Sequence, residues 1–471
     1  MSKMKEFLKQ NKVFLALLFV VFLVHLVFFA GFHEILWDSG VYVGMGKFLF
    51  SGGSAGLWEH IRPPFWPAVL GLLWFLGLGS AIFGLILELL LSLGAVVLLY
   101  QITKHYFKEP AALFASAIFS FSSIFFYLGF HLYTEVPAVF FVLLSVYLFI
   151  RKRFYWSGFA VALAFLSKFP AGMFLLVLLF VLLLDKDIKS SLKLSTGFLI
   201  PVIPVLIAYQ IVYSSAMFPF LEAREVILRV LGCNVLRFRP WWHYFYLIYS
   251  ENVLNLFAIA GLFAFFVKFK KDKLLPLLCL AVPLVYFSQM HCRDYRYLVL
   301  FIPFVAMFSS LGIIFLLDKI KSHKKQVFTI VLIAVLGFSV FNGVRFYINK
   351  EVVVTNPAAE GYFRFLEHKD VSGEIWSSNP VVAVYTDAKV DKIYYPVYDA
   401  GISADFYNYL TKHTENVEYV FLDNCGGGII CRPDDAVCEE KNKDLRDFLD
   451  ANLKKVYDEE YGRCFYLVYK N

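Results

Sequence analysis

Residues 33–67, HEILWDSGVYVGMGKFLFSGGSAGLWEHIRPPFWP, lie between two apolar segments. The preceding segment, Val13–Phe32, is long enough to cross a bilayer as a helix. Residues 33–67 are therefore expected to form a loop at one membrane face, with Asp38 at the start of an amphipathic helix. We interpret the rest of the chain as a membrane scaffold that builds a cavity around this loop.

The composition of the 471 residues is that of a membrane protein. Hydrophobic residues make up 59% and charged residues only 17%, which excludes a soluble globular protein. Aromatic residues, at 19%, gather beside the apolar runs, as Trp and Tyr do at membrane interfaces. The formal net charge of +7 is spread over short loops, which fits the positive-inside rule and gives little support to nucleic-acid binding.

The basic clusters predict a topology. The short basic N-terminus is expected in the cytoplasm, and the long apolar run without a small-residue cleavage site argues against a signal peptide. Five later clusters are also expected in the cytoplasm: Lys104–Lys108, Arg151–Arg153, Lys186–Lys193, Lys268–Lys273 and Lys319–Lys325. About eleven spans satisfy every cluster: Val13–Phe32 and residues 80–102, 110–126, 135–150, 156–168, 170–185, 194–213, 244–267, 274–290, 297–318 and 326–346.

The segment Phe65–Gly79 is too short for a span, and counting it as one would invert all later loops. We expect it to be a juxtamembrane or re-entrant helix on the external side. The same count places the C-terminus outside. The predicted architecture is therefore a mostly helical, polytopic bundle with its N-terminus in the cytoplasm.

The composition changes near Asn349, where charges become frequent and apolar runs shorten to strand length. Short strands alternating with helical patterns predict a small α/β domain of about 120 residues. The sequence thus predicts a transmembrane domain at 1–348 and an extracytoplasmic α/β domain at 349–471.

Four of the seven cysteines fall in this predicted domain: Cys425, Cys431, Cys438 and Cys464. An even number in an external domain favours one or two disulfides. A zinc site is the alternative, but no CxxC pair or nearby His supports it.

Acidic groups at the external ends of predicted spans are functional candidates, because charge in or against a bilayer is costly. Asp38 either caps a helix Ser39–Phe50 or acts as a general base at the mouth of a cavity, and the two roles are compatible. Glu135 opens the predicted helix Glu135–Ile150. It either interacts with the helix dipole or takes part in acid–base work or in positioning an acceptor.

Basic groups on the same predicted face form a second set of candidates. Lys168 either snorkels or lies buried beside a phosphate. His291, Arg293 and Arg296 share a very short turn with Asp294, and they either pair with it or bind phosphate oxygens, which the arginine fork matches.

Two further basic stretches lie on that predicted face. His60 and Arg62 stand just before Pro63-Pro64. The loop Ser214–His243 carries four arginines before Trp241-Trp242, and we interpret it as an amphipathic surface helix with an aromatic anchor, with a lid over the cavity as the alternative.

Several stretches, taken in order, resemble a known family. They are WDSGVY, RPPFWPAVLGLLWFLG, TEVPAVFFVLLSVYLFIRKR, AFLSKFP and RYLVLFIPFVAMFSSLG. In order and spacing they resemble the membrane glycosyltransferases of the GT-C fold that use polyprenyl-phosphate sugars, in particular the protein O-mannosyltransferases and the bacterial lipid A aminoarabinose transferases. The resemblance covers residues 10–346, and the tail beyond residue 350 carries none.

The resemblance implies roles for individual residues. The first-loop acid of the family is catalytic and corresponds to Asp38, and a second acidic position corresponds to Glu135, although many relatives have Asp there. Lys168 and Arg296 correspond to basic positions that contact the lipid phosphate. Ser39 follows Asp38 where many relatives have a second acid, so the resemblance implies glycosyl transfer more firmly than protein mannosylation.

The predicted reaction transfers a sugar from a polyprenyl- or dolichyl-phosphate donor to an acceptor hydroxyl at the external face, with inversion. Asp38 takes the acceptor proton, and cations stabilise the departing phosphate. The predicted phosphate ligands are Lys168, Arg296, His291, Arg293 and Arg62. The leaving group is a stable anion that needs no acid, so no metal or other cofactor is expected. The expected partners are the lipid-linked donor, membrane lipid and an acceptor protein, lipid or glycan.

A transporter or a sensor with an external domain is the alternative. A transporter buries ionisable residues near the middle of the membrane and often has internal repeats, whereas here the spans are nearly free of mid-helix charge apart from Glu88 and no repeat is found. A sensor would not need acids and bases at the outer ends of separate spans. The sequence therefore favours a multi-pass membrane glycosyltransferase in which Asp38 meets Lys168 and Arg296 in one external pocket.

Overall fold

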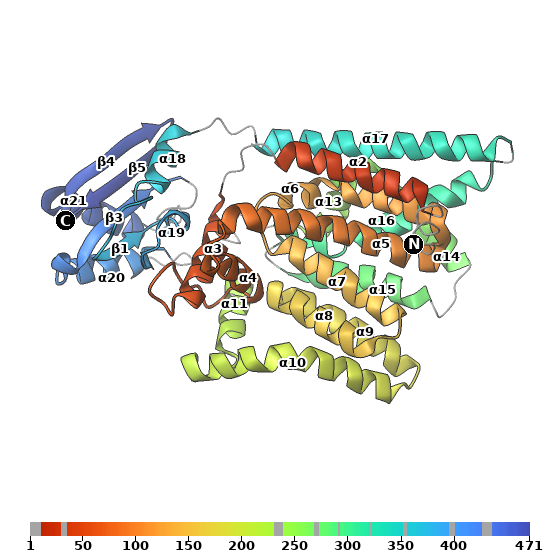
Figure 1. Cartoon of the computed structure of the whole chain (residues 1–471), viewed down its shortest axis with the longest axis horizontal. Coiled ribbons are helices and arrows are strands. Elements are labelled where there is room, and N and C mark those ends of the chain that lie inside the picture. Colours follow the sequence, from red (N-terminus) through yellow and green to blue (C-terminus); the bar gives the residue numbers. More distant parts are fainter. Residues whose placement is uncertain are drawn as a thin grey trace. The chain divides into compact units, whose positions relative to one another are not determined.

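The computed structural model describes residues 11–29, 35–229, 239–267, 273–290, 293–320, 322–351, 356–394, 401–425 and 436–471. Most of these residues are helical, and a small sheet lies in the C-terminal part of the chain (Figure 1). The chain forms two compact units, which are described separately. A helical unit comprises Met1–His33, Leu85–Phe218 and Arg239–Val352, and a mixed unit comprises Glu34–Gly84, Pro219–Phe238 and Val353–Asn471.

The helical unit is built from apolar helices joined by short turns: α2 (Lys12–Phe29), α5 (Ser80–Ser120), α6 (Ser123–Leu128), α7 (Glu135–Ile150), α8 (Phe154–Ser167), η1 (Phe169–Gly172), α9 (Met173–Leu184), α10 (Ile188–Tyr213), α13 (His243–Glu251), η2 (Val253–Leu256), α14 (Phe257–Val267), α15 (Leu274–Gln289), η4 (Tyr295–Leu300), α16 (Ile302–Leu317) and α17 (Lys324–Glu351). Among the described residues, four helices are long and apolar enough to cross a membrane: Lys12–Phe29, Ser80–Ser120, Ile188–Tyr213 and Lys324–Lys350. The predicted helical bundle is confirmed, and the count of eleven spans stays a prediction.

Helix α5 covers the predicted spans 80–102 and 110–126, and its backbone is non-helical at Lys108, with φ of 69°, two residues before Pro110. The predicted division between these two helices is therefore confirmed, whereas another predicted span differs. The predicted helix 244–267 is broken at Asn252, where the backbone is extended. The Asn252 side chain accepts a hydrogen bond from the Leu254 N–H at 3.0 Å and so begins η2, because Asn offers the backbone a local alternative to the helix.

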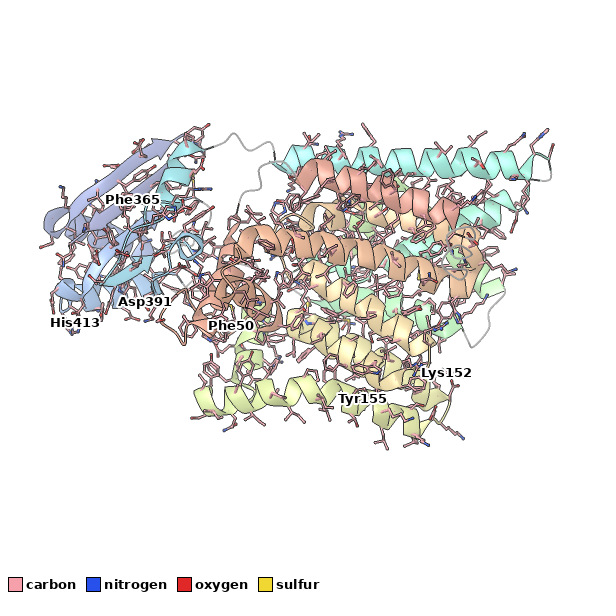
Figure 2. The ribbon with its side chains drawn as sticks, in the orientation of Figure 1. Phe50, Lys152, Tyr155, Phe365, Asp391 and His413 are labelled. Carbon is pink, nitrogen blue, oxygen red and sulfur yellow. A yellow bond between two sulfur atoms is a disulfide. The ribbon has the colours of Figure 1, made fainter. Side chains whose placement is uncertain are left out.

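Helices α8 and α10 approach each other so closely that their backbones touch. A Cβ on Gly158 would lie 1.9 Å from the Leu194 carbonyl oxygen, and a Cβ on Gly197 would lie 1.9 Å from that of Tyr155. Small residues of this kind allow close packing of membrane helices. Figure 2 labels Tyr155 near the start of α8. This packing fixes α8, which ends directly before Lys168.

Large apolar side chains cover the outside of several helices. Ile211 of α10 is 76% exposed and Val212 is 68% exposed, and Ile330 and Ile333 of α17 are both 65% exposed. Contiguous apolar surface of this kind is rare on soluble proteins and is expected where a helix meets lipid.

The mixed unit combines a sheet with short helices: α3 (Trp37–Phe50), α4 (Phe65–Phe75), α11 (Phe218–Arg229), α18 (Pro357–Phe363), β1 (Glu374–Ser377), α19 (Val382–Tyr385), β2 (Val390–Lys392), α20 (Gly401–Leu410), η5 (Thr414–Asn416), β3 (Val417–Asp423), α21 (Ala436–Asn452), β4 (Lys454–Tyr461) and β5 (Cys464–Lys470). The strand order is β2-β1-β3-β5-β4. Strands β2, β1 and β3 are parallel, whereas β5 runs antiparallel to β3 and β4. The predicted α/β character of the C-terminal part is confirmed, and the division at residue 348 stays a prediction.

The sheet is covered on both faces, because alternate residues of its strands enter two different cores. One core contains Phe421 of β3 and Val468 of β5 together with α18. The other contains Val420 and Leu422 of β3 together with α20 and α21. This alternation follows from the two-residue period of a strand.

Helix α3 differs from the expected amphipathic helix, because all residues from Asp38 to Lys47 are buried. Its apolar residues Val41 and Met45 join the core that contains Phe421. The helix begins at Trp37, with Leu36 at the N-cap position. The capping role considered for Asp38 is therefore wrong: its carboxylate lies in the first helical turn, where it interacts favourably with the helix dipole.

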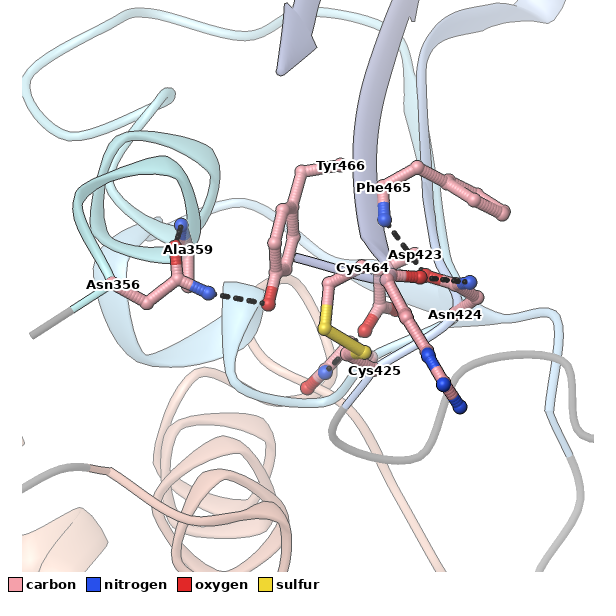
Figure 3. Close-up of a disulfide and its surroundings, with 10 residues drawn as sticks. Asn356, Ala359, Asp423, Asn424, Cys425, Cys464, Phe465 and Tyr466 are labelled. Carbon is pink, nitrogen blue, oxygen red and sulfur yellow. Dashed lines mark hydrogen bonds between the residues drawn. A yellow bond between two sulfur atoms is a disulfide. The ribbon is translucent and has the colours of Figure 1, made fainter. Parts of the chain in front are cut away.

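One disulfide joins Cys425, two residues after the end of β3, to Cys464 at the start of β5 (Figure 3). It links two neighbouring strands whose ladder pairs Asp423 with Tyr466. The prediction of at least one disulfide is confirmed. Cys431 and the side chain of Cys438 lie outside the described part of the chain.

Candidate active site

The first group of candidate residues surrounds Asp38 in the mixed unit. Arg62, in the turn before α4, places its Nη2 atom 2.8 Å from Asp38 Oδ1. Its Nε atom lies 3.1 Å from Oε2 of Glu59, a wholly buried carboxylate. One guanidinium therefore lies between two carboxylates, and we call Asp38, Glu59 and Arg62 the Asp38 cluster.

Aromatic and basic side chains enclose the Asp38 cluster. Arg62 lies over the ring of Tyr42, 5.7 Å from its centroid. The pKa of Arg62 is raised well above its usual range: burial alone would lower it, but Asp38, Tyr42 and Glu59 outweigh burial. Burial, and next the Glu59 carboxylate, raise the pKa of the Tyr394 hydroxyl, and burial lowers the pKa of Lys392. The C-terminal part of the chain thus contributes to the surroundings of this cluster.

The second group lies in the helical unit and surrounds Glu135, which is buried in the first turn of α7. Lys168 places its Nζ atom 2.7 Å from Glu135 Oε1, and the Nε atom of Arg296 lies 4.0 Å from the same oxygen. We call these three residues the Glu135 cluster. Three predicted site residues from separate segments are therefore brought together, and their roles stay predictions.

Local structure explains how the two cations reach Glu135. Lys168 follows α8 in an extended conformation, with φ of −152° and ψ of 107°, so its side chain leaves the helix axis. It lies over the ring of Tyr297, 5.0 Å from the centroid. Asp294 caps η4 by accepting the Arg296 N–H at 2.9 Å, and it also pairs with the Arg296 Nη2 atom at 3.0 Å. The pairing with Asp294 and the approach to Glu135 therefore occur together.

Glu88 supports the loop that leads into Glu135. This carboxylate is fully buried in α5, and its Oε2 atom accepts the Leu132 N–H at 2.9 Å. Leu132 has a φ of 56°, which is uncommon for a residue with a side chain. In the sequence, Glu88 stands out only as a mid-span charge. The high cost of such a charge was the available signal that it has a role.

The remaining candidates are placed differently. The Arg293 guanidinium donates hydrogen bonds to the Ser288 carbonyl oxygen at 2.8 and 3.0 Å and to that of Arg239. His291 lies outside the described residues. Helix α11 occupies part of the loop for which a surface helix was predicted.

Glu59 and Tyr394 were missed by the sequence analysis. Glu59 stands three residues before Arg62, and this spacing in a short turn is a weak signal for an ion pair. Tyr394 is separated from Glu59 by more than half of the chain, and no local pattern links the two. Among the residues that the structure describes, no group of three or more His, Cys, Asp or Glu side chains is arranged to hold a metal ion.

Comparisons with known proteins identify the fold and match part of the chain to a family model. Residues 62–213 match the family model described as dolichyl-phosphate-mannose-protein mannosyltransferase. The structure of ArnT from Cupriavidus metallidurans bound to undecaprenyl phosphate is similar with a TM-score of 0.66 and 14% identity, over 98% of each chain. Its apo state gives a TM-score of 0.67 and 14% identity, over 100% of this chain and 98% of that one.

The oligosaccharyltransferase of Archaeoglobus fulgidus, tethered to an acceptor peptide, is similar with a TM-score of 0.64 and 11% identity, over 89% of this chain and 70% of that one. No curated protein sequence matches the chain. These comparisons confirm the predicted GT-C fold and the resemblance on which it was based. The family model and the fold together indicate a multi-pass membrane glycosyltransferase.

Proposed function

We propose that this membrane glycosyltransferase transfers a sugar from a polyprenyl-phosphate donor to an acceptor hydroxyl on the outer face of the membrane. The lipid-phosphate donor is supported by the match to a dolichyl-phosphate-mannose family model and by the similar ArnT structure, which holds undecaprenyl phosphate. The observation that carries the proposal is the Glu135 cluster, in which one buried acid holds two cations. Cations held in this way are ready to bind an anionic leaving group.

The Asp38 carboxylate acts as the general base in this proposal. It takes the proton of the acceptor hydroxyl while that oxygen attacks the anomeric carbon from the face opposite the phosphate. The new carbon–oxygen bond forms as the bond to the phosphate oxygen breaks, so the configuration inverts. Arg62, 2.8 Å from Asp38, stabilises the negative charge that the base must carry.

Lys168 and Arg296 bind the donor phosphate and stabilise the charge that builds up on it. Glu135 holds both side chains in place before the donor arrives. Arg62 is proposed to contact the phosphate as well. Arg293 has its guanidinium bound to backbone carbonyls, so we propose that it shapes the turn that carries Arg296. No step in this scheme needs a metal, because the lipid phosphate departs as a stable anion.

The proposal is tested with full-length protein in liposomes that contain a radiolabelled polyprenyl-phosphate sugar. Asp38→Asn should abolish transfer, since the amide cannot take a proton, while the folded protein is recovered in normal yield. Asp370→Asn, which changes an exposed acid of the mixed unit, is the matched control and should retain full activity. Near-normal turnover by Asp38→Asn would disprove the assignment of the base, and a retained anomeric configuration in the product would disprove inversion.

A further inference from the structure

Helix α3, which carries Asp38, packs as one of the helices of the C-terminal α/β fold. Val41 and Met45 of α3 share a core with Ile375 of β1 and Val390 of β2. A Cβ on Gly40 would lie 2.8 Å from the backbone of Val381, so the helix touches the backbone that leads into α19. The helix that carries the proposed base is therefore fixed by residues more than 300 positions away in the sequence.

A buried lysine clamps the C-terminal half of α3. The Lys47 side chain is only 4% exposed, and its Nζ atom donates hydrogen bonds to the Val384 and Thr386 carbonyl oxygens at 2.9 Å each and to Asp387 Oδ1 at 3.0 Å. The two carbonyls lie at the end of α19, where helical carbonyls lack intrahelical partners. Burial lowers the pKa of Lys47 despite the opposing effect of Asp387. A charge buried to this extent is stable only with such partners.

The loop after α3 is joined to the free edge of the sheet. The Gly56 N–H donates to the Ala388 carbonyl at 3.0 Å, and the Val390 N–H donates to the Gly56 carbonyl at 2.8 Å. Gly56 has a φ of 72°, and a Cβ there would lie 2.1 Å from the Gly44 carbonyl oxygen, so only glycine fits. The loop is thus held between α3 and the segment that begins β2.

The N-terminal end of α3 is held by the residue that follows β2. Trp37 contacts the ring of Tyr394 edge-on, with centroids 4.5 Å apart. Tyr394 interacts in turn with Glu59, which holds Arg62 against Asp38. Both ends of α3 therefore meet the same short segment, residues 382–394.

We propose that residues 382–394 of the C-terminal α/β fold position Asp38 for catalysis, with Lys47 as the main positioning residue that links α3 to them. This inference rests on the proposed role of Asp38 as the base. A base works only within hydrogen-bond distance of the proton it takes, and a displacement of about 1 Å can lower a rate about 100-fold. The clamp at Lys47 stops α3 from sliding along the sheet.

The test compares Lys47→Met with Lys389→Met in full-length protein in liposomes. Methionine keeps the apolar stem of the Lys47 side chain up to the ε position and removes its three hydrogen bonds. We expect kcat to fall by about 10- to 100-fold, with the KM for the lipid donor little changed, because α3 shifts while the Glu135 cluster does not. Lys389 makes an exposed ion pair with Asp391 at 2.9 Å in the same segment, so Lys389→Met should leave both constants unchanged.

Two readouts separate positioning from a general loss of structure. Hydrogen–deuterium exchange should rise in the peptide 37–50 of Lys47→Met and not in Lys389→Met. In an Asp38→Asn background, Lys47→Met should cause no further loss of the residual rate, because its effect acts through the base. Unchanged exchange in peptide 37–50, a normal kcat, or an equal further loss in the Asp38→Asn background would each overturn the inference.

A second pair of variants covers the case in which Lys47→Met does not fold. Asp387→Asn keeps an oxygen acceptor for Lys47 and for the Trp74 indole N–H, which lies 3.0 Å from Asp387 Oδ1. Asp387→Ala removes it. Asp387→Ala should lower kcat and raise exchange in α3 more than Asp387→Asn does, and equal effects would overturn the inference. If Asp38→Asn itself proved active, the proposed function would fail, and the exchange data would still decide whether this segment holds α3.

Discussion

The Asp38 cluster and the Glu135 cluster arrange the same kinds of side chain in opposite ways. Arg62 lies between two carboxylates, whereas Glu135 lies between two cations. A guanidinium shared by two acids only partly neutralises each of them, which suits an acid that must accept a proton. Asp294, which pairs with Arg296 at 3.0 Å, balances the second cation of the Glu135 cluster, so a phosphate would bind Arg296 in place of Asp294. This difference supports the proposal that the first cluster supplies the base and the second binds the phosphate.

The largest effect on activity should come from removing the negative charge of Asp38 and of Glu135 in two separate variants. Asp38→Asn should lower kcat by at least about 1,000-fold with little change in the donor KM, since it removes a base that acts in the transition state. Glu135→Gln should lower kcat far less and change mainly the donor KM, because it alters how the cations are held. Steady-state kinetics with varied donor concentration measure both constants. If both variants changed kcat and the donor KM in the same way, the proposed difference in role between the two clusters would be disproved.

Removing the cations of the Glu135 cluster should have the next largest effect. Lys168→Met and Arg296→Gln should each raise the donor KM by about tenfold, which corresponds to about 1.4 kcal/mol of lost binding. The double variant should lose less than the product of the two, because both cations contact one Glu135 oxygen. Lys324→Met, which breaks an exposed ion pair with Asp318, is the matched control. A donor KM unchanged in both single variants would exclude this cluster from phosphate binding.

Substitution of Glu88, which holds the loop that leads into Glu135, should have a smaller effect on activity. Glu88→Gln keeps an oxygen acceptor for the Leu132 N–H, so its activity should stay within about threefold of the native protein. Glu88→Leu removes the acceptor and leaves a buried N–H unpaired, which costs about 1–3 kcal/mol. Its activity and its thermal unfolding temperature should both fall. Activity assays and unfolding curves for the two variants measure this difference, and identical behaviour would remove Glu88 from the positioning of the loop.

The Glu135 cluster could largely be predicted from the sequence, and the surroundings of Asp38 could not. Glu135, Lys168 and Arg296 each stand at the end of an apolar run, where a charge is conspicuous, and their order along the chain matched a family pattern. The contacts that hold α3 are invisible to such patterns: Lys47 and Asp387 are 340 residues apart. The amphipathic expectation for α3 failed because Gly40 and Gly46 lie against other backbone segments, and Gly44 lies against the side chains of Leu57 and Ala383, instead of facing solvent.

Two predictions about where helices begin and end were wrong. Asp38 was considered as an N-cap because Asp favours that position, but the helix begins at Trp37, two residues before the predicted start at Ser39. The break at Asn252 was missed, although the polar residues Ser250, Glu251 and Asn252 interrupt the apolar pattern there. The proposal that the two clusters act on one donor, the count of spans and the sidedness of the membrane domains stay predictions.

Asp423 is a further buried acid that sharpens the comparison, because the hydrogen bonds to it come from neutral groups. Asp423, at the end of β3, accepts hydrogen bonds from the Ser378 hydroxyl at 2.7 Å and the Asn379 amide at 3.2 Å. Burial raises its pKa to about 7, against the lowering effect of these hydrogen bonds. Between the ordinary pKa of an Asp carboxyl and about pH 7, Asp423 therefore keeps its proton in the folded state and loses it in the unfolded state. The bound proton stabilises the folded state. This contribution to the free energy of unfolding is complete below about pH 4 and is lost as the pH rises through about 7.

The free energy of unfolding should accordingly fall by about 1 kcal/mol per pH unit between pH 5 and 7 through Asp423 alone. Asp423→Asn cannot titrate, so its unfolding temperature should vary less over this range than that of the native protein. Asp370→Asn, which alters an exposed acid, should keep the native pH dependence. Thermal unfolding in detergent from pH 5 to 8 measures all three proteins. The same slope in Asp423→Asn as in the native protein would show that Asp423 is ionised throughout, and that a buried acid in this fold needs no cation to hold its charge.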